Sequence, residues 1–142
     1  LDTNGINPYI IVELLCDNLV DYIAMDIKAP LTIEKYSKVT GTKCDEQKLI
    51  DLLNSINTII KIAPDYEFRT TVVPGFHTPK DIEQIAKYAI KGAKKYVIQN
   101  FHPCDTLIDP SLQSIKPFSR ADLEDFASVA RPYVKEVKVR NI

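Results

Sequence analysis

Short apolar runs alternate with longer segments of helical spacing along this chain. Each apolar run is long enough for one strand of a sheet that is covered by other elements. The predicted strands are residues 20–27, 67–73, 95–99 and 134–139. A further strand ends before the Asn4-Gly5 turn, so that strands occur from one end of the chain to the other.

Capping residues mark the starts of the helices between these strands. Pro8 and Thr78-Pro79 have the residue types favoured at helix starts, and Ser119 stands three residues before Asp122, the spacing of a capping box. The predicted helices are residues 8–17, 32–39, 45–60, 78–91 and 119–130. The polar, proline-containing segment 100–117 is the one stretch whose composition suits a lid.

This alternation predicts an α/β fold of β-α units with parallel strands joined by right-handed crossovers. An open doubly wound sheet and an arc of a barrel both satisfy the pattern. In either architecture functional residues gather where strands end and loops to helices begin. We expect residues 1–142 to form a single domain.

Asp26 and Lys28 are the first candidate site residues. They lie two positions apart at the end of an apolar strand, so both side chains point to the same face. A carboxylate and an ammonium group are costly there unless they are paired or functional. Asp2 ends the preceding strand in the same way, and its carboxylate beside Asp26 would suit a cation or an ammonium group. An ion pair that merely closes the strand end is the alternative.

Three further polar residues follow strand ends. Arg69 and Thr71 share one face of their strand, which periodicity alone leaves as either interior or solvent-facing. His102 lies just past the next strand, where a histidine is a candidate ligand contact or an ordinary loop residue. We expect His77 to lie at the surface, beyond the Pro74-Gly75 turn.

Composition and charge exclude some classes of binding partner. The formal net charge is -1, with no basic stripe for nucleic acid and no apolar run long enough to cross a membrane, so we expect a cytoplasmic protein. The three cysteines, Cys16, Cys44 and Cys104, form no paired motif, and we expect reduced thiols. The chain begins at Leu1 without an initiator methionine, and we expect it to be part of a longer protein.

Four segments, in this order and spacing, resemble the C-terminal part of radical S-adenosylmethionine enzymes that activate glycyl-radical proteins. They are residues 1–5, 24–28, 68–75 and 97–103. The sequences of residues 26–30 and 69–78 are most similar to those of activators of anaerobic ribonucleoside-triphosphate reductase. Pyruvate formate-lyase activating enzymes are the next most similar group. The resemblance implies part of a (β/α)6 partial TIM barrel, a glycyl-radical enzyme as partner and a flavodoxin or ferredoxin-type reductant.

The same resemblance implies the ligands. S-adenosylmethionine would chelate a [4Fe-4S] cluster, whose reduction cleaves the sulfonium to a 5′-deoxyadenosyl radical that takes a glycine hydrogen. Asp2, Thr3, Met25 and Asp26 match positions that bind a monovalent cation against the S-adenosylmethionine carboxylate. Lys28 and His102 match positions that make other contacts to the ligand. Arg69 and Thr71 match the strand that faces the nucleoside or the glycine loop.

The main departure from the family pattern concerns the cluster. The CxxxCxxC motif and the glycine-rich strand that follows it are not among these 142 residues, and none of the three cysteines is assigned to replace them. We therefore assign no catalytic residue to this segment and expect it to be inactive alone.

Two other functions remain open. A non-catalytic docking domain would use the open arc of an incomplete barrel, and its unpaired edges predict self-association. The Asp-x-Lys pair also resembles that of orotidine phosphate decarboxylases, but the third carboxylate expected three residues later is replaced by Leu31.

Overall fold

The computed structural model describes residues 1–103 and 109–141. Its centre is a five-stranded parallel sheet in which the strands follow their sequence order. The strands are β1 (Asp2–Thr3), β2 (Tyr22–Asp26), β3 (Asp65–Val72), β4 (Lys95–Asn100) and β5 (Glu136–Arg140). The predicted α/β alternation with parallel strands is confirmed, and the described residues supply five strands of it.

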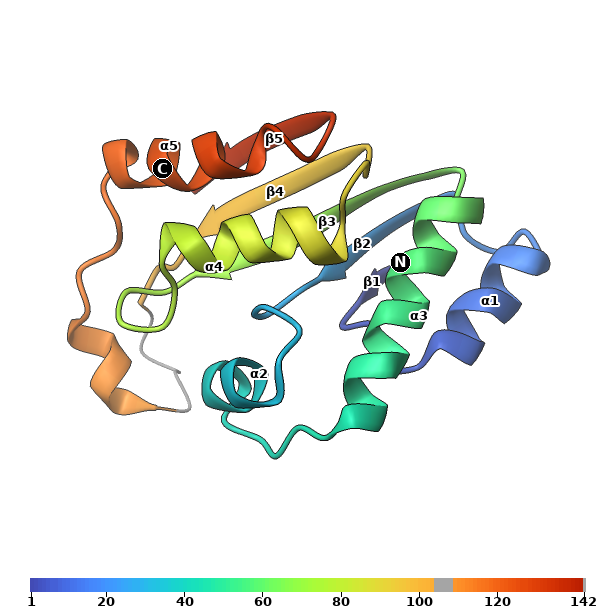
Figure 1. Ribbon diagram of the computed structural model, residues 1–142, viewed down its shortest axis with the longest axis horizontal. Coiled ribbons are helices and arrows are strands. Elements are labelled where there is room, and N and C mark those ends of the chain that lie inside the picture. The colour runs from blue at the N-terminus through green and yellow to red at the C-terminus, as the bar shows by residue number, and fades with distance from the viewer. Residues whose placement is uncertain (104–108, 142) are drawn as a thin grey trace.

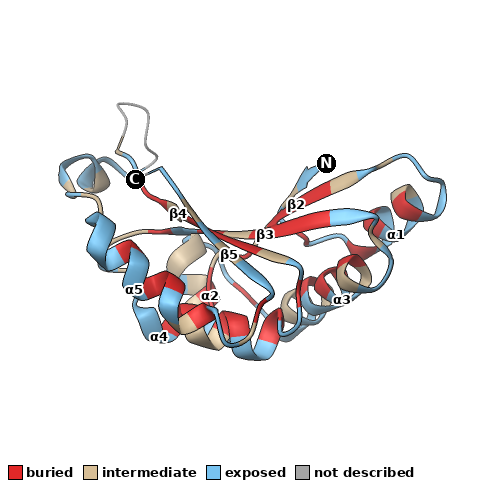
Figure 2. Ribbon diagram, turned by 90° about the horizontal axis from the view of Figure 1, so that it is seen from above, coloured by how far each residue is buried: buried red, intermediate tan, exposed pale blue. Residues whose placement is uncertain are grey.

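A helix or a helical segment connects each strand to the next. These elements are α1 (Pro8–Cys16), α2 (Ile33–Thr40), α3 (Glu46–Ile62), α4 (Pro79–Gln84), the π-helix η1 (Ile85–Ala89), the 3-10 helix η2 (Pro110–Ser114) and α5 (Arg120–Ala130). Figures 1 and 2 show the five α-helices on one face of a curved sheet. The opposite, concave face carries the polar residues described below.

The core lies between the sheet and this helical layer. Strand residues that point toward the helices are buried and mostly apolar, among them Met25, Phe68 and Ile98. They meet the apolar stripes of the helices, such as Ile56 and Ile59 of α3 and Phe126 of α5. Because successive strand residues alternate between the faces, the same strands direct their charged side chains to the concave face.

Side-chain caps form at the helix starts. The side chains of Asn7, Thr32 and Asp45 accept hydrogen bonds from the first turns of α1, α2 and α3. Thr78 with Asp81 and Ser119 with Asp122 form two reciprocal capping boxes. These local bonds satisfy backbone N–H groups that a helix start leaves without partners.

Two predicted segments differ in detail. The helix expected to run to residue 91 widens into a π-helix after Gln84. Part of the predicted lid, residues 104–108 including Cys104, lies outside the described residues. The end of that segment is anchored, because the Asn100 side chain donates to the Phe118 carbonyl (2.8 Å) and accepts from its N–H (3.2 Å). In the part of the chain that is described, no helix is both long and apolar enough to cross a membrane.

The turn after β1 depends on Gly5. This residue has φ +74, and a methyl group on it would overlap the Met25 side chain. Its carbonyl accepts a hydrogen bond from buried Ser55 of α3 at 2.6 Å, so the turn cannot shift freely. We expect Gly5→Ala to lower the free energy of unfolding by about 2 kcal/mol, from backbone strain and overpacking together.

Urea denaturation measures this effect, and Gly41→Ala is the matched control. Gly41 also has positive φ (+65), but no atom lies within 4 Å of its added methyl group. We therefore expect Gly41→Ala to lower the free energy of unfolding by about 1 kcal/mol, from backbone strain alone. Equal losses in the two variants would contradict the role given to Met25.

Candidate functional site

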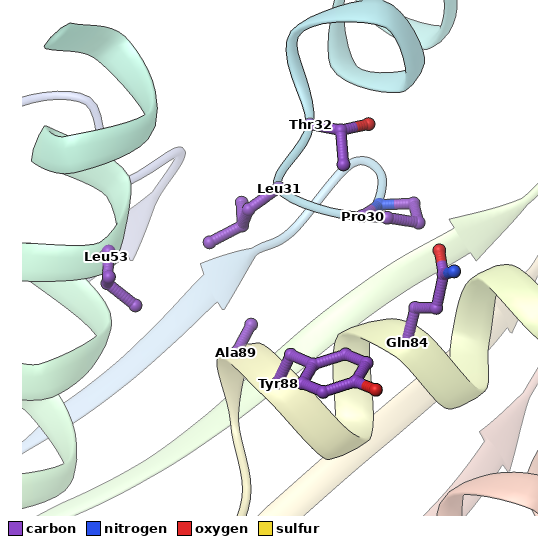
Figure 3. Close-up of a pocket in the computed structure, with 7 residues that line it drawn as sticks. All are labelled: Pro30, Leu31, Thr32, Leu53, Gln84, Tyr88 and Ala89. Atoms are coloured by element: carbon purple, nitrogen blue, oxygen red, sulfur yellow. The ribbon is translucent and has the colours of Figure 1, made fainter. Parts of the chain in front are cut away.

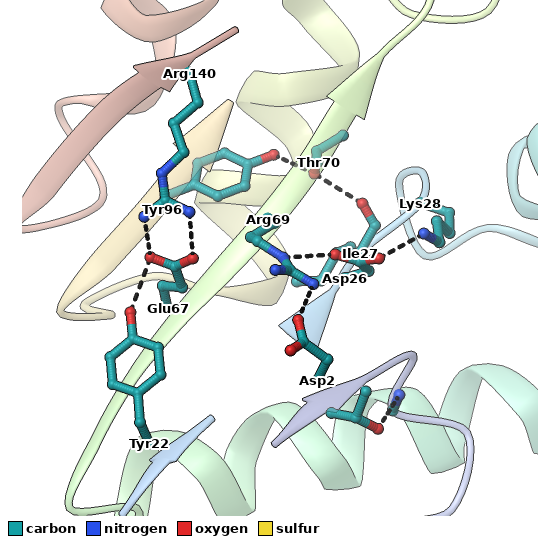
Figure 4. A network of polar contacts seen from close by, with 12 residues as sticks. Asp2, Tyr22, Asp26, Ile27, Lys28, Glu67, Arg69, Thr70, Tyr96 and Arg140 are labelled. Atoms are coloured by element: carbon teal, nitrogen blue, oxygen red, sulfur yellow. Dashed lines mark hydrogen bonds and ion pairs between the residues drawn. The ribbon is translucent and has the colours of Figure 1, made fainter. Parts of the chain in front are cut away.

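Neighbouring strands bring four predicted residues together on the concave face. Asp26 ends β2 and lies opposite Arg69 of β3 in the parallel register. β1 pairs with the other side of β2, which places Asp2 on the same face. Lys28 follows two residues after Asp26 and returns its side chain to that carboxylate (Figure 4).

Arg69 joins the two carboxylates. Its Nη2 lies 2.7 Å from Asp2 Oδ1, and its Nε donates to Asp26 Oδ1 at 2.8 Å. Lys28 Nζ donates to the other Asp26 oxygen at 2.7 Å. Asp26 therefore has a cationic partner on each oxygen, and the guanidinium lies between Asp2 and Asp26, where the sequence predicted an external cation.

The electrostatics follow from this geometry. Burial alone would raise the pKa of Asp26, but the hydrogen bonds and charges of Lys28 and Arg69 outweigh it and lower the pKa. Burial opposes the charge of Arg69, and the two carboxylates reverse this effect and raise its pKa. The Asp26 side chain is 29% exposed and that of Lys28 is 41% exposed, so a ligand can reach this charged group.

A second polar group on the same face was not predicted from the sequence. Arg140 of β5 binds both oxygens of Glu67 at 2.7 and 2.8 Å, and Tyr22 donates to Glu67 Oε2 at 2.8 Å (Figure 4). Glu67 is buried, yet these partners lower its pKa against the effect of burial. Side chains alternate between the two faces of a strand, and Glu67 lies two residues before Arg69. This spacing could have placed Glu67 on the same face as Arg69 from the sequence.

The prediction that His77 lies at the surface is wrong. His77 is 5% exposed, its Nδ1 accepts from Val73 N at 3.1 Å, and its Nε2 lies 2.8 Å from the Lys28 carbonyl. The turn around Gly75 folds back toward the end of β2, which brings the ring against Lys28. Burial is the main cause that lowers its pKa.

The remaining predicted residues lie apart from this charged group. Thr3 Oγ1 accepts a hydrogen bond from Gly5 N, and the Met25 side chain is buried on the helical face, away from the concave face. Thr71 is exposed. His102 Nε2 lies 2.9 Å from the Asn141 carbonyl, at the end of β5.

The described residues differ in how well they suit the implied cofactors. A charged group with both signs suits the ammonium and carboxylate of an amino acid. The two described cysteines, Cys16 and Cys44, do not suit an iron–sulfur cluster, because Cys16 is exposed and Cys44 is buried elsewhere. Within residues 1–103 and 109–141, no three His, Cys, Asp or Glu side chains are grouped to hold a metal ion.

A cavity of about 400 Å³ lies on the other side of the sheet, among the helices (Figure 3). Its lining residues are Pro30, Leu31, Thr32, Leu53, Gln84, Tyr88 and Ala89. Leu31, the position where a decarboxylase would need a carboxylate, thus lines an apolar cavity away from Asp26 and Lys28. The predicted site residues do not contribute to this cavity.

Comparison with known proteins gives one informative match. No family model and no solved structure matches the chain. A protein of Methanocaldococcus jannaschii, named as a glycyl-radical enzyme activating enzyme, is 33% identical over 149 aligned positions. The alignment covers the whole of this chain and 58% of the relative. This similarity supports the family resemblance seen in the motifs, at the level of glycyl-radical enzyme activation and not of a subtype.

Proposed function

We propose that this chain is the S-adenosylmethionine-binding, C-terminal portion of a radical S-adenosylmethionine activating enzyme. Its target would be a glycyl-radical enzyme such as anaerobic ribonucleoside-triphosphate reductase or pyruvate formate-lyase. The observation that carries the proposal is the charged group of Asp2, Asp26, Lys28 and Arg69 at the strand ends. The similarity of the whole chain to 58% of a protein named as a glycyl-radical enzyme activating enzyme supports it.

In this proposal the chain's own residues bind and orient the amino acid portion of the ligand. Lys28, whose ammonium is partly exposed, pairs with the ligand carboxylate. Asp26 and Asp2 attract the ligand ammonium or a monovalent cation, in competition with Arg69. Opposite charges within one partly dry cleft recognise a zwitterion more strongly than separate charges in water.

When bound, S-adenosylmethionine supplies the carbon radical that abstracts the glycine hydrogen. The [4Fe-4S] cluster that reduces it would have ligands outside this sequence, and a flavodoxin or ferredoxin-type protein in the cytoplasm would supply the electron. We assign no electron-transfer step to the described residues, and expect no 5′-deoxyadenosine from the chain alone under reduction.

Titration of the chain with S-adenosylmethionine, followed by amide chemical shifts, tests the proposal. We expect shifts at the ends of β2 and β3, and an affinity loss of about tenfold in Lys28→Ala and in Asp26→Asn, since each removes a charge-assisted contact. Lys43→Ala, at an exposed position after α2, is the matched control and should bind as the wild type does. Unchanged affinity in the first two variants would overturn the proposal and favour a docking domain.

A further inference from the structure

Lys28 is held by its backbone as well as by its side chain. The residue before it is fixed on both sides, because Ile27 N donates to the Arg69 carbonyl at 2.8 Å and Thr70 Oγ1 donates to the Ile27 carbonyl at 2.7 Å. After Ile27 the regular pairing of β2 with β3 ends. The His77 side chain then binds the Lys28 backbone itself.

The geometry of the His77 ring fixes the position of its proton. Nδ1 accepts the Val73 N–H, and a carbonyl can only accept, so the proton must lie on Nε2 and point at the Lys28 oxygen. Both ring nitrogens are therefore used, and the ring is buried. Phe76 N and His77 N each donate to the Val73 carbonyl at 3.1 Å, which makes the turn that presents the ring compact.

The buried Tyr36 side chain of α2 lies beside the same backbone. Burial raises the pKa of Tyr36 to about 12, and the Lys28 backbone has the smaller, opposite effect on it. The hydrogen bond that holds the Lys28 carbonyl is therefore that of His77.

The surroundings of His77 keep its ring neutral. Burial lowers its pKa, and the charge of Lys35 acts in the same direction. Asp81 would raise the pKa, but its carboxylate is engaged by Lys35 Nζ at 2.8 Å and by Thr78. A neutral imidazole retains the Nδ1 lone pair that the Val73 N–H requires.

We propose that His77 is a positioning residue that fixes the Lys28 backbone and thereby sets Lys28 Nζ against Asp26 for ligand binding. The identity of the ligand rests on the proposed function, whereas the hydrogen bond from His77 to the Lys28 carbonyl does not depend on it. His77 acts through Lys28 and makes no contact with the bound molecule.

Two substitutions separate this role from a purely structural one. His77→Asn retains an oxygen that can accept the Val73 N–H but is too short to reach the Lys28 carbonyl. His77→Gln has the length to donate to that carbonyl. Loss of a buried ring destabilises both variants, so only the contact to Lys28 distinguishes them.

The first readout is independent of any ligand. Nitrogen chemical shifts of the wild type should show the neutral Nε2–H tautomer of His77. Carbon-detected titration should show a higher pKa for Asp26 in His77→Asn than in His77→Gln, because Lys28 is released in the first variant. Equal Asp26 pKa values in both variants and the wild type would overturn the proposal.

The second readout is affinity for S-adenosylmethionine. We expect about a fivefold loss in His77→Asn, the effect of one net hydrogen bond, and recovery of most of it in His77→Gln. Equal losses in both variants would assign His77 a structural role only. If the wild type does not bind S-adenosylmethionine, the proposed function fails, and the Asp26 titration still decides the role of His77.

Discussion

Replacing Arg140 by leucine is expected to lower the free energy of unfolding by about 2 kcal/mol at neutral pH, because it leaves a buried carboxylate without its cation. The Glu67 side chain is 3% exposed, and Arg140 binds both of its oxygens. Among the described residues, the Tyr22 hydroxyl would remain as the hydrogen-bond partner, and Lys95 as a nearby positive charge. The Arg140 side chain is itself 42% exposed, which keeps the effect below that of a fully buried pair.

The sign of the pH dependence follows from the lowered pKa of Glu67. Its folded-state pKa lies below the ordinary value of 4.5, so the stabilisation is present above that value and is lost as pH falls through the folded-state pKa. The difference between Arg140→Leu and the wild type should therefore shrink in acid. Urea denaturation at neutral and acid pH measures it.

Two variants serve as controls for Arg140→Leu. Adding Glu67→Gln should recover part of the loss, since a neutral amide is less costly to bury than an unpaired carboxylate. Lys138→Leu removes a cation from the same strand, but its pair with Glu136 is about half exposed and should contribute little. An equal loss in Lys138→Leu would contradict the role given to Glu67.

Replacing Arg69 by leucine is also expected to cost about 2 kcal/mol of unfolding free energy, and to raise the pKa of Asp26. The Arg69 side chain is 19% exposed and that of Asp26 is 29% exposed, so their bond is poorly screened by water. Asp2 is 77% exposed, and its bond to Arg69 should contribute little. Denaturation curves and titration of the Asp26 carboxyl group measure the two effects.

Asp2→Asn is the matched control for Arg69→Leu, and its stability should stay close to that of the wild type. Because the pKa of Asp26 is lowered, the penalty of Arg69→Leu should be present above the ordinary aspartate value of 3.8 and diminish as pH falls below it. A penalty that is unchanged in acid would mean that Arg69 stabilises the fold by packing and not through Asp26.

The elements of this fold could be predicted closely from local patterns. Asn7, Thr32 and Asp45 cap helices within a few residues of the expected starts, because a capping bond joins groups three residues apart. The strands keep their predicted places, although β2 begins at Tyr22 and not at residue 20. The π-helix after Gln84 had no sequence signal, since its apolar spacing was compatible with an ordinary helix.

The position of the candidate site could be predicted from the sequence, but the ion pairs between its residues could not. Alternation placed Asp26 and Lys28 on one face, and parallel strands brought Asp2 beside them. The partner of the two carboxylates is Arg69, because the register of β2 with β3 sets these residues side by side. Periodicity along one strand carries no information about that register.

The sequence by itself therefore determined the order and type of the elements and the strand ends where charges collect, since these depend on contacts between residues close along the chain. Only the tertiary structure decided that Arg140 reaches across β4 to Glu67 and that His77 is buried against Lys28. Those contacts depend on sheet curvature and on a turn folding back over a strand end. The two residue pairs are separated by 73 and 49 positions along the chain. Because their polar groups are buried, each group needs a partner.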